Sequence, residues 1–176
     1  MITIKKLSQK QEEIQFSKDL YEQSFPIEER RDFSLVLDIY KTDLLSLNLI
    51  YDNEIMVGIL NYWDFNDSLY IEHLAVSEQY RNRKIASKVL EQLNTQNKLI
   101  VLEVELPRDE LSKRRIDFYQ RNSFSIQPYP YFQPPYRKGE ERIKMHIMAN
   151  TQKPINKTKY DEVVSIIEKK VYEKFW

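Results

Sequence analysis

Residues 69–93 change from a strand-like apolar run to the apolar spacing of a helix within a few positions. The run at 69–76 is typical of a strand, and the apolar side chains after it recur on one helical face. Three cations, Arg81, Arg83 and Lys84, stand where the helix is expected to open. Cations are unfavourable beside the positive end of a helix dipole, so three of them at this place suggest that an anion binds there. The free backbone N–H groups of a helix start would bind the same anion. A solvated basic turn is the alternative.

The other elements follow from apolar spacing and from breaker residues. The stretch at 127–140 is rich in proline and tyrosine, and we expect a loop that stays outside regular ladders. The order of elements predicts a mixed α+β fold. Strands are expected at 2–6, 45–51, 55–64, 69–76, 99–104, 124–126 and 143–148, and helices at 9–24, 28–40, 81–93, 109–122 and 160–175.

Composition excludes several classes of site and partner. The 27 basic residues balance 27 acidic ones, so the basic excess typical of nucleic-acid binders is missing. The chain has no cysteine, which excludes disulfides, thiolate metal sites and a cysteine nucleophile. His73 and His146 are isolated, so we expect no metal. No signal peptide or membrane span is expected, and a cytoplasmic location follows as the prediction.

The 69–93 segment resembles the coenzyme-binding motif of the GCN5-related N-acetyltransferase (GNAT) superfamily. In that family a strand ending in a Leu-Ala-Val-like triplet leads to Arg/Gln-x-x-Gly-x-Gly/Ala at a helix start. Arg81 takes the first motif position, Ala86 takes the last, and Lys84 stands where glycine is usual. The resemblance implies acetyl-CoA as acyl donor, bound by Leu74, Ala75, Val76, Arg81, Asn82, Arg83, Lys84, Ile85, Ala86 and Phe118.

Lys84 is a departure that needs a physical explanation. Glycine at this position lets the backbone approach the diphosphate without a side chain that could clash. We expect Lys84 to have a helical φ, because it lies at a helix start, and to turn its side chain outward or add charge to the phosphates. A positive φ would strain the lysine and weaken coenzyme binding.

Residues 118–124 match a second family motif, Phe-Tyr-x-x-x-Gly-Phe, with Ser123 in place of glycine. The two motifs have the family's spacing, and the resemblance covers roughly residues 2–148. It implies a mixed, mostly antiparallel central sheet flanked by helices, with an extra C-terminal helix beyond it. It also implies direct attack of an amine on the thioester. Tyr119 matches the family's general acid, and the N–H of Val76 matches its oxyanion donor.

Glu72 is the expected general base, acting directly or through a water. Strand alternation puts it on one face with Tyr70, and in similar enzymes this face meets the acceptor. Glu103 and Glu105 on another strand share a face, and they could bind a cationic acceptor or replace Glu72 as base. For each glutamate the alternative to a catalytic or binding role is an ion pair with a nearby lysine or arginine. For Tyr119 the alternative to the acid role is packing on the helix face.

The family closes its acceptor site with parts that correspond to residues 24–32 and 129–137. These segments combine acidic and aromatic residues, which suit a small basic or aromatic amine, a peptide N-terminus or a lysine. A rigid loop that merely packs would have the same composition. The predicted acceptor-binding residues are Glu28, Glu29, Tyr70, Glu103, Tyr131 and Tyr136.

We expect residues 1–150 to form the acetyltransferase-like domain and 151–176 a helical extension packed on it. One alternative function is a non-catalytic acyl-CoA-binding or sensor domain on the same fold. Another is an interaction protein that uses Phe175 and Trp176 to bind a partner, including a second copy of the chain. An amine acceptor is the expected partner, and neither nucleic acid nor a membrane is expected.

Overall fold

The computed structural model describes residues 1–175, and Trp176 lies outside the described residues. The chain divides into two compact units, one of residues 1–64 with 71–97, the other of residues 65–70 with 98–176. The predicted interaction role of Trp176 therefore stays a prediction.

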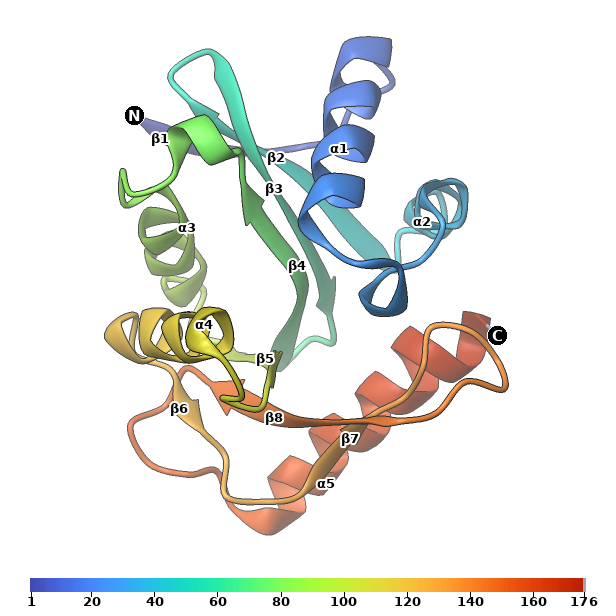
Figure 1. Ribbon diagram of the computed structural model, residues 1–176, viewed down its shortest axis with the longest axis vertical. Helices are drawn as coiled ribbons and strands as arrows, with labels where there is room; N and C mark the ends of the chain where they lie inside the picture. The colour runs from blue at the N-terminus through green and yellow to red at the C-terminus, as the bar shows by residue number, and fades with distance from the viewer. Residues whose placement is uncertain (176) are drawn as a thin grey trace. The chain divides into compact units, whose positions relative to one another are not determined.

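The first unit holds four strands in the order β1-β2-β3-β4, and the β1–β2 and β2–β3 pairs are antiparallel. Asn53 takes a left-handed φ of 56° between β2 and β3, in the turn that separates the strands predicted at 45–51 and 55–64. Figure 1 shows α1 and α2 on one side of these strands and α3 on the other. The elements are β1 (Ile2–Lys6), α1 (Gln11–Ser24), η1 (Ile27–Glu29), α2 (Phe33–Tyr40), β2 (Leu45–Asp52), β3 (Ile55–Asp64), β4 (Ser68–Val76), η2 (Glu78–Tyr80) and α3 (Ile85–Asn94).

The second unit is organised around β8, which pairs antiparallel with β5, β6 and β7. The C-terminal helix α5 runs alongside β7 and β8 (Figure 1), and the ring centroids of Tyr129 and Tyr160 lie 4.7 Å apart there. The elements are β5 (Leu99–Glu105), α4 (Glu110–Arg121), β6 (Ser125–Ile126), β7 (Tyr131–Gln133), β8 (Ile143–Ala149), α5 (Lys157–Ile167), the π-helical η3 (Glu168–Tyr172) and the 3-10 turn η4 (Glu173–Phe175).

The predicted helix at 28–40 and the predicted loop at 127–140 are among the segments that differ from the structure. The expected helix at 28–40 begins only at Phe33, because residues 30–32 are extended and Arg31 is held by side chains described below. The expected loop at 127–140 contains β7, which pairs with β8. The prolines lie on either side of this three-residue strand and not within it. Each residue of β7 therefore keeps the backbone N–H group that a strand needs for pairing.

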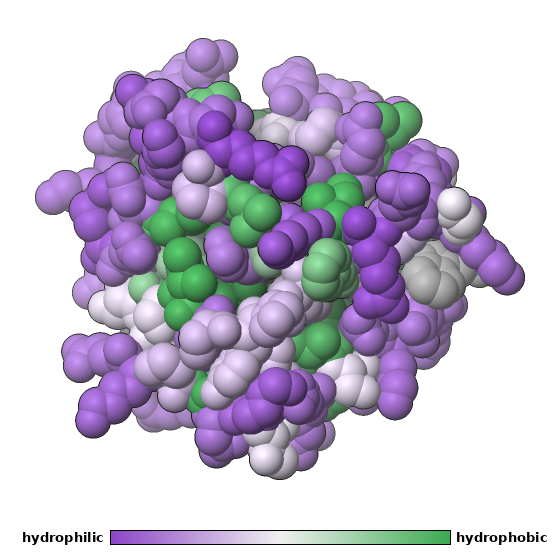
Figure 2. Space-filling view, turned by 60° about the horizontal axis from the view of Figure 1, so that its bottom comes forward, coloured by the Kyte–Doolittle hydropathy of each residue, from purple (hydrophilic) through white to green (hydrophobic). Residues whose placement is uncertain are grey.

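Large apolar side chains fill the interior of each unit. In the first unit Trp63, Ile59 and Leu60 are almost fully buried, and in the second Val101 and Met148 are. Figure 2 shows a face covered mostly by polar residues, with apolar side chains visible between them. Single exposed apolar residues are normal in folded proteins and need no partner. No helix within residues 1–175 is long and apolar enough to cross a membrane.

Candidate active site

The turn after β4 carries the first group of predicted coenzyme residues. Asn82 and Lys84 both have left-handed φ values, 63° and 58°, and α3 begins at Ile85. The N–H of Arg81 donates to the carbonyl of Glu78 at 3.1 Å. Within residues 1–175, no backbone carbonyl accepts from the amides of 82–86. Successive backbone N–H groups in a turn that contains left-handed residues can form an anion-binding concavity.

Two sequence expectations about this turn were wrong. The helix begins at Ile85, so the basic residues precede it, and Lys84 does not have the helical φ that we expected. The turn needs a left-handed residue before the helix, which is the conformation that glycine adopts without strain. Ser123, at the other lost glycine position, also has a positive φ, of 70°. Both replacements therefore keep the glycine conformation and bear its steric cost.

The C-terminal end of β4 is fixed by close backbone contacts. A Cβ added to Gly58 on β3 would lie 2.5 Å from the carbonyl oxygen of Ala75, so only glycine fits this approach. The Nε of Arg81 donates to the carbonyl of Val76 at 3.2 Å. This hydrogen bond joins the triplet Leu74-Ala75-Val76, which is predicted to bind the coenzyme, to the basic turn that follows it.

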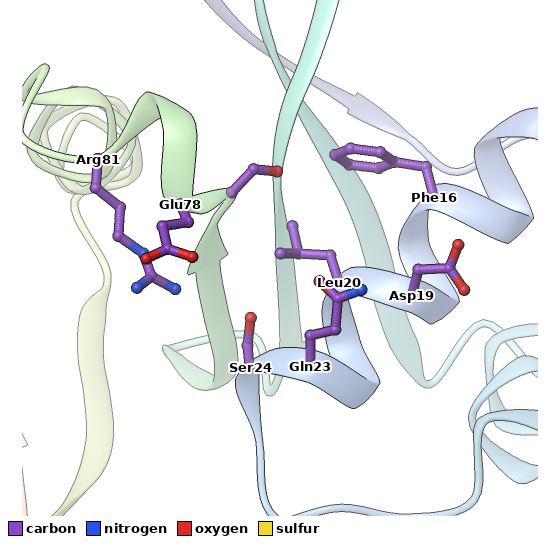
Figure 3. Close-up of a pocket in the computed structure, with 8 residues that line it drawn as sticks. Phe16, Asp19, Leu20, Gln23, Ser24, Glu78 and Arg81 are labelled. Atoms are coloured by element: carbon purple, nitrogen blue, oxygen red, sulfur yellow. The ribbon is translucent and has the colours of Figure 1, made fainter.

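A pocket of about 240 Å³ lies beside this turn. Figure 3 shows Leu20, Gln23 and Ser24 of α1 facing the segment that carries Glu78 and Arg81. Its wall mixes apolar, acidic and basic groups. The Oγ of Ser24 is buried and has no hydrogen-bond partner within residues 1–175.

Glu72 lies in a buried ion pair with Arg31, and the two side chains are only 2% and 3% exposed. The indole Nε1 of Trp63 donates to the second carboxylate oxygen of Glu72 at 2.7 Å. Burial opposes the charge of Glu72, but Arg31 and the hydrogen bonds offset it, so the pKa of this carboxyl lies below its usual value. Such a carboxylate is a weak proton acceptor.

The segment between α1 and α2 is anchored on β4 by further contacts. The N–H of Arg31 donates to the hydroxyl of Tyr21 at 3.0 Å. The Nε2 of His73 lies 3.1 Å from the carbonyl of Glu29, and the imidazole packs edge-on against Tyr21 and Phe25. Burial lowers the pKa of His73, despite the nearby Glu72 carboxylate. The predicted acceptor residues Glu28 and Glu29 lie in this segment, in η1.

Tyr119 lies on α4 between two aromatic neighbours. Its ring centroid is 5.1 Å from that of Phe118 and 5.7 Å from that of Phe124. Burial raises the pKa of the Tyr119 phenol to about 12. Its hydroxyl has no hydrogen-bond partner in the described part of the chain, residues 1–175. The phenol is therefore protonated at neutral pH and has its hydrogen available for another acceptor.

Four of the predicted acceptor residues come together in the second unit. Glu103 is half-buried and accepts a hydrogen bond from Tyr131. Tyr70 and Tyr136 are buried beside it, and both contact Tyr172 of the C-terminal helix. Burial raises the pKa of Glu103, while its hydrogen bonds act in the opposite direction. We call these residues, with Gln133, the Glu103 cluster.

Sequence reasoning missed four residues at these sites. Arg31 and Trp63 hold Glu72, while Gln133 and Tyr172 donate to Glu103. Trp63 carried a signal, because it lies at the end of the strand predicted at 55–64, near the segments expected to close the acceptor site. Tyr172 carried none, since the final helix lies outside the family motifs. Within residues 1–175, no group of His, Cys, Asp and Glu side chains is arranged to hold a metal ion.

Comparisons with known proteins agree with this geometry. The family model described as "Acetyltransferase (GNAT) domain" matches residues 46–126. A solved structure from Bacteroides thetaiotaomicron, assigned to the GNAT acetyltransferase family, is 31% identical with a TM-score of 0.88, and the alignment covers 97% of this chain and 98% of that one. This likeness confirms the predicted fold class.

Two further proteins are similar over part of the chain or in fold. The Bacillus subtilis protein YjbC, assigned as an acetyltransferase, is 31% identical over 103 residues, 57% of this chain. The match spans about half of that protein, 52% of its length. The structure of Arabidopsis thaliana Naa50 with the bisubstrate analogue CoA-Ac-MVNAL is 19% identical, with a TM-score of 0.60 and coverage of 84% and 97% of the two chains. That likeness is one of fold.

Proposed function

Because the chain belongs to the GCN5-related N-acetyltransferase (GNAT) family, we propose that it moves the acetyl group of acetyl-CoA directly onto a primary amine in a ternary complex. The observation that carries the proposal is the turn at 82–86, where successive backbone N–H groups have no backbone acceptor within residues 1–175. Direct transfer agrees with the absence of cysteine, which removes an acyl-cysteine route.

The donor side of the proposal rests on the first unit. Free N–H groups at the start of α3 and in the preceding turn suit the diphosphate of coenzyme A. The exposed side chains of Arg81, Arg83 and Lys84 add positive charge at the same turn. We assign the N–H of Val76 to the oxyanion of the tetrahedral intermediate, where a main-chain donor stabilises the developing charge.

Tyr119 is our proposed general acid. The leaving thiolate benefits from a proton or a hydrogen bond, and a phenol can supply either. A pKa of about 12 keeps the hydroxyl protonated across the neutral range, and the hydroxyl has no partner in the described residues that would compete. The aromatic rings of Phe118 and Phe124 hold the phenol in place.

For the general base, the electrostatics favour Glu103 over Glu72. An amine must lose a proton before it can attack, and a carboxylate accepts that proton better when its pKa is raised toward neutrality. The pKa of Glu103 is raised and that of Glu72 is lowered by Arg31. The hydrogen bonds to Glu103 described above come from uncharged donors, whereas Glu72 is paired with the charged Arg31. We therefore propose Glu103 as base, directly or through a water, and Glu72 as the anchor of Arg31.

The acceptor is proposed to be a primary amine that carries a positive charge before it reacts. The Glu103 cluster combines a carboxylate with tyrosine rings, a combination that suits ammonium groups. Glu28 and Glu29 remain proposed acceptor residues of the first unit. Naa50, whose structure contains a bisubstrate analogue of coenzyme A and a short peptide, supports a peptide N-terminus as one candidate.

Titration with acetyl-CoA, followed by thermal unfolding, tests the donor site. A ligand at 100 times its Kd stabilises the fold by about 2.7 kcal/mol, which corresponds to about 5–10 °C for a chain of this size. Arg81→Glu should abolish this shift. The control Lys88→Glu makes the same charge change within α3, seven positions further along the chain, and should retain the shift. Equal shifts in both variants would remove Arg81 from the coenzyme site.

Thiol release from acetyl-CoA tests transfer. Because the chain has no cysteine, a thiol reagent reports only on coenzyme A. The acceptors are a primary alkylamine, an aromatic amine and a peptide with a free N-terminus. Tyr119→Phe should keep the acetyl-CoA thermal shift and lose roughly 10²-fold in rate. Unchanged turnover in this variant would exclude Tyr119 as the acid.

A non-catalytic acyl-CoA sensor remains the second candidate function. The observation that favours it is the loss of both motif glycines, at Lys84 and Ser123. A sensor would show the thermal shift with acetyl-CoA and no thiol release with any amine.

A further inference from the structure

The C-terminal helix ends in an unusual segment. After α5, residues Glu168–Tyr172 form a π-helical stretch, and a 3-10 turn follows. π-helical segments are rare, and they frequently occur at functional sites. This one carries Tyr172, which is 1% exposed although it lies four positions from the end of the chain. The side chain points into the Glu103 cluster rather than toward solvent.

Tyr172 donates a hydrogen bond from its hydroxyl to Oε2 of Glu103 at 2.8 Å. A tyrosine hydroxyl has one proton, and in Tyr172 that proton is directed at the carboxylate. Gln133 donates to the Tyr172 oxygen at 3.0 Å, and the Tyr70 hydroxyl lies 3.2 Å from that oxygen. Tyr70 also lowers the pKa of Glu103 through a side-chain hydrogen bond.

The hydrogen bonds of the cluster all favour a charged Glu103. Tyr131 donates to one carboxylate oxygen, and Gln133 and Tyr172 donate to the other. No lysine or arginine within residues 1–175 forms an ion pair with it. Uncharged donors therefore hold a desolvated carboxylate that has no counterion, an arrangement that leaves its protonation sensitive to each donor.

Other charged groups near the cluster are paired or face elsewhere. Glu105 pairs with Arg115, and Glu168 pairs with Arg142. On β8, His146 lies opposite Val104, the neighbour of Glu103. The titratable groups that face or influence the carboxyl are Tyr70 on β4, Tyr131 on β7, Tyr136 in the following loop, Tyr160 on α5, and Tyr172 and Glu168 on η3.

We propose that Tyr172 is a positioning residue for the reaction: its hydroxyl orients the Glu103 carboxylate and keeps it deprotonated, ready to accept a proton from the acceptor amine. The inference rests on the proposed function of Glu103 as base. It gives the C-terminal helix a part in the chemistry, because the π-helical turn is the element that delivers this hydroxyl.

The test measures the protonation of Glu103 directly. Glutamate side-chain carboxyls are followed by ¹³C NMR from pH 4 to 9, and the Glu103 signal is assigned by its loss in Glu103→Gln. Tyr172→Phe removes one donor and keeps the ring that packs on Tyr136, at 5.1 Å between centroids. We expect the Glu103 titration to move upward by roughly 1–2 pH units, since a hydrogen bond to a charged group is lost.

Two variants serve as controls. Tyr131→Phe removes another donor from the same carboxylate and should shift the titration in the same direction. Tyr160 also lies in the C-terminal helical segment, but its hydroxyl contacts the backbone carbonyls of Tyr129 and Pro130, so Tyr160→Phe should move the titration far less than Tyr172→Phe does. A residue with only a structural role would lower the melting temperature of Tyr172→Phe and leave the titration in place.

The outcomes separate this inference from the proposed function. If Tyr172→Phe folds and its Glu103 titration coincides with that of the wild type, the positioning role is refuted. If that titration shifts, the coupling stands, and the pH dependence of thiol release should shift with it. If Glu103→Gln retains full thiol release, the base assignment fails instead, and Tyr172 then has no part in the chemistry.

Discussion

The left-handed conformation of Lys84 makes a quantitative prediction about stability. With a φ of 58°, a non-glycine residue is strained by roughly 1–2 kcal/mol, because Cβ approaches the following carbonyl oxygen. Lys84→Gly removes this strain, and glycine loses roughly 0.5–1 kcal/mol more chain entropy on folding. The net gain is about 0.5–1 kcal/mol, or about 1–4 °C in melting temperature for a chain of this size.

Lys84→Ala is the matched control. Both variants remove the same charge from the start of α3, so any electrostatic change is common to the two. Alanine keeps its Cβ and hence the strain, and the difference between the two melting temperatures isolates the backbone contribution. Ser123, with a φ of 70°, offers the same comparison at a second position. If Lys84→Gly melts at or below Lys84→Ala, the strain argument is wrong.

The same geometry revises the expectation that lysine weakens coenzyme binding. We expect the left-handed φ of Lys84 to belong to the folded turn whether or not a ligand is bound. Its cost is therefore borne on folding and not on binding. We expect the glycine and alanine variants of residue 84 to bind acetyl-CoA with equal affinity, measured by calorimetry. Tighter binding by the glycine variant would mean that the turn changes conformation when the ligand arrives.

Three further predictions concern other positions. Gly58→Ala should cost roughly 1–3 kcal/mol in denaturant unfolding, because the new Cβ meets the Ala75 carbonyl, and an unchanged midpoint would contradict that contact. Arg31→Met should lower the free energy of unfolding by roughly 3–5 kcal/mol, because it leaves the charge of Glu72 buried without its partner. Adding Glu72→Gln to this variant should recover part of that loss in denaturant unfolding. No recovery would indicate that the role of Arg31 is purely steric. The raised pKa of Glu103 contributes stability to the folded state that is complete below the unfolded pKa near 4.5 and is lost as the pH rises through the folded pKa. The melting temperature of Glu103→Gln should therefore rise relative to that of the wild type from pH 4.5 upward. If the difference between the two melting temperatures does not change with pH, burial of the charge is contradicted.

Local sequence patterns were sufficient for most of the fold. The strand at Ile55–Asp64 and the first strand were predicted to the residue, because apolar runs bounded by turn residues leave few alternatives. The helix before Tyr40 was predicted too long, since nothing local shows that Arg31 will be drawn into a buried pair with Glu72. The domain boundary at residue 150 stays a prediction.

The amino-acid sequence by itself determined the family motifs, the position of the proposed coenzyme-binding turn and the candidate residues Tyr119 and Glu103, because these depend on residue type and spacing along the chain. Only the tertiary structure decided the conformation of Lys84, the partners of Glu72 and the arrival of Tyr172 at Glu103. Each of these depends on groups between 9 and 69 positions apart, or on a backbone angle that neighbouring elements impose. Hydrogen bonds and charge–charge interactions depend on the distance between groups in space, and the separation of two residues along the chain does not give that distance.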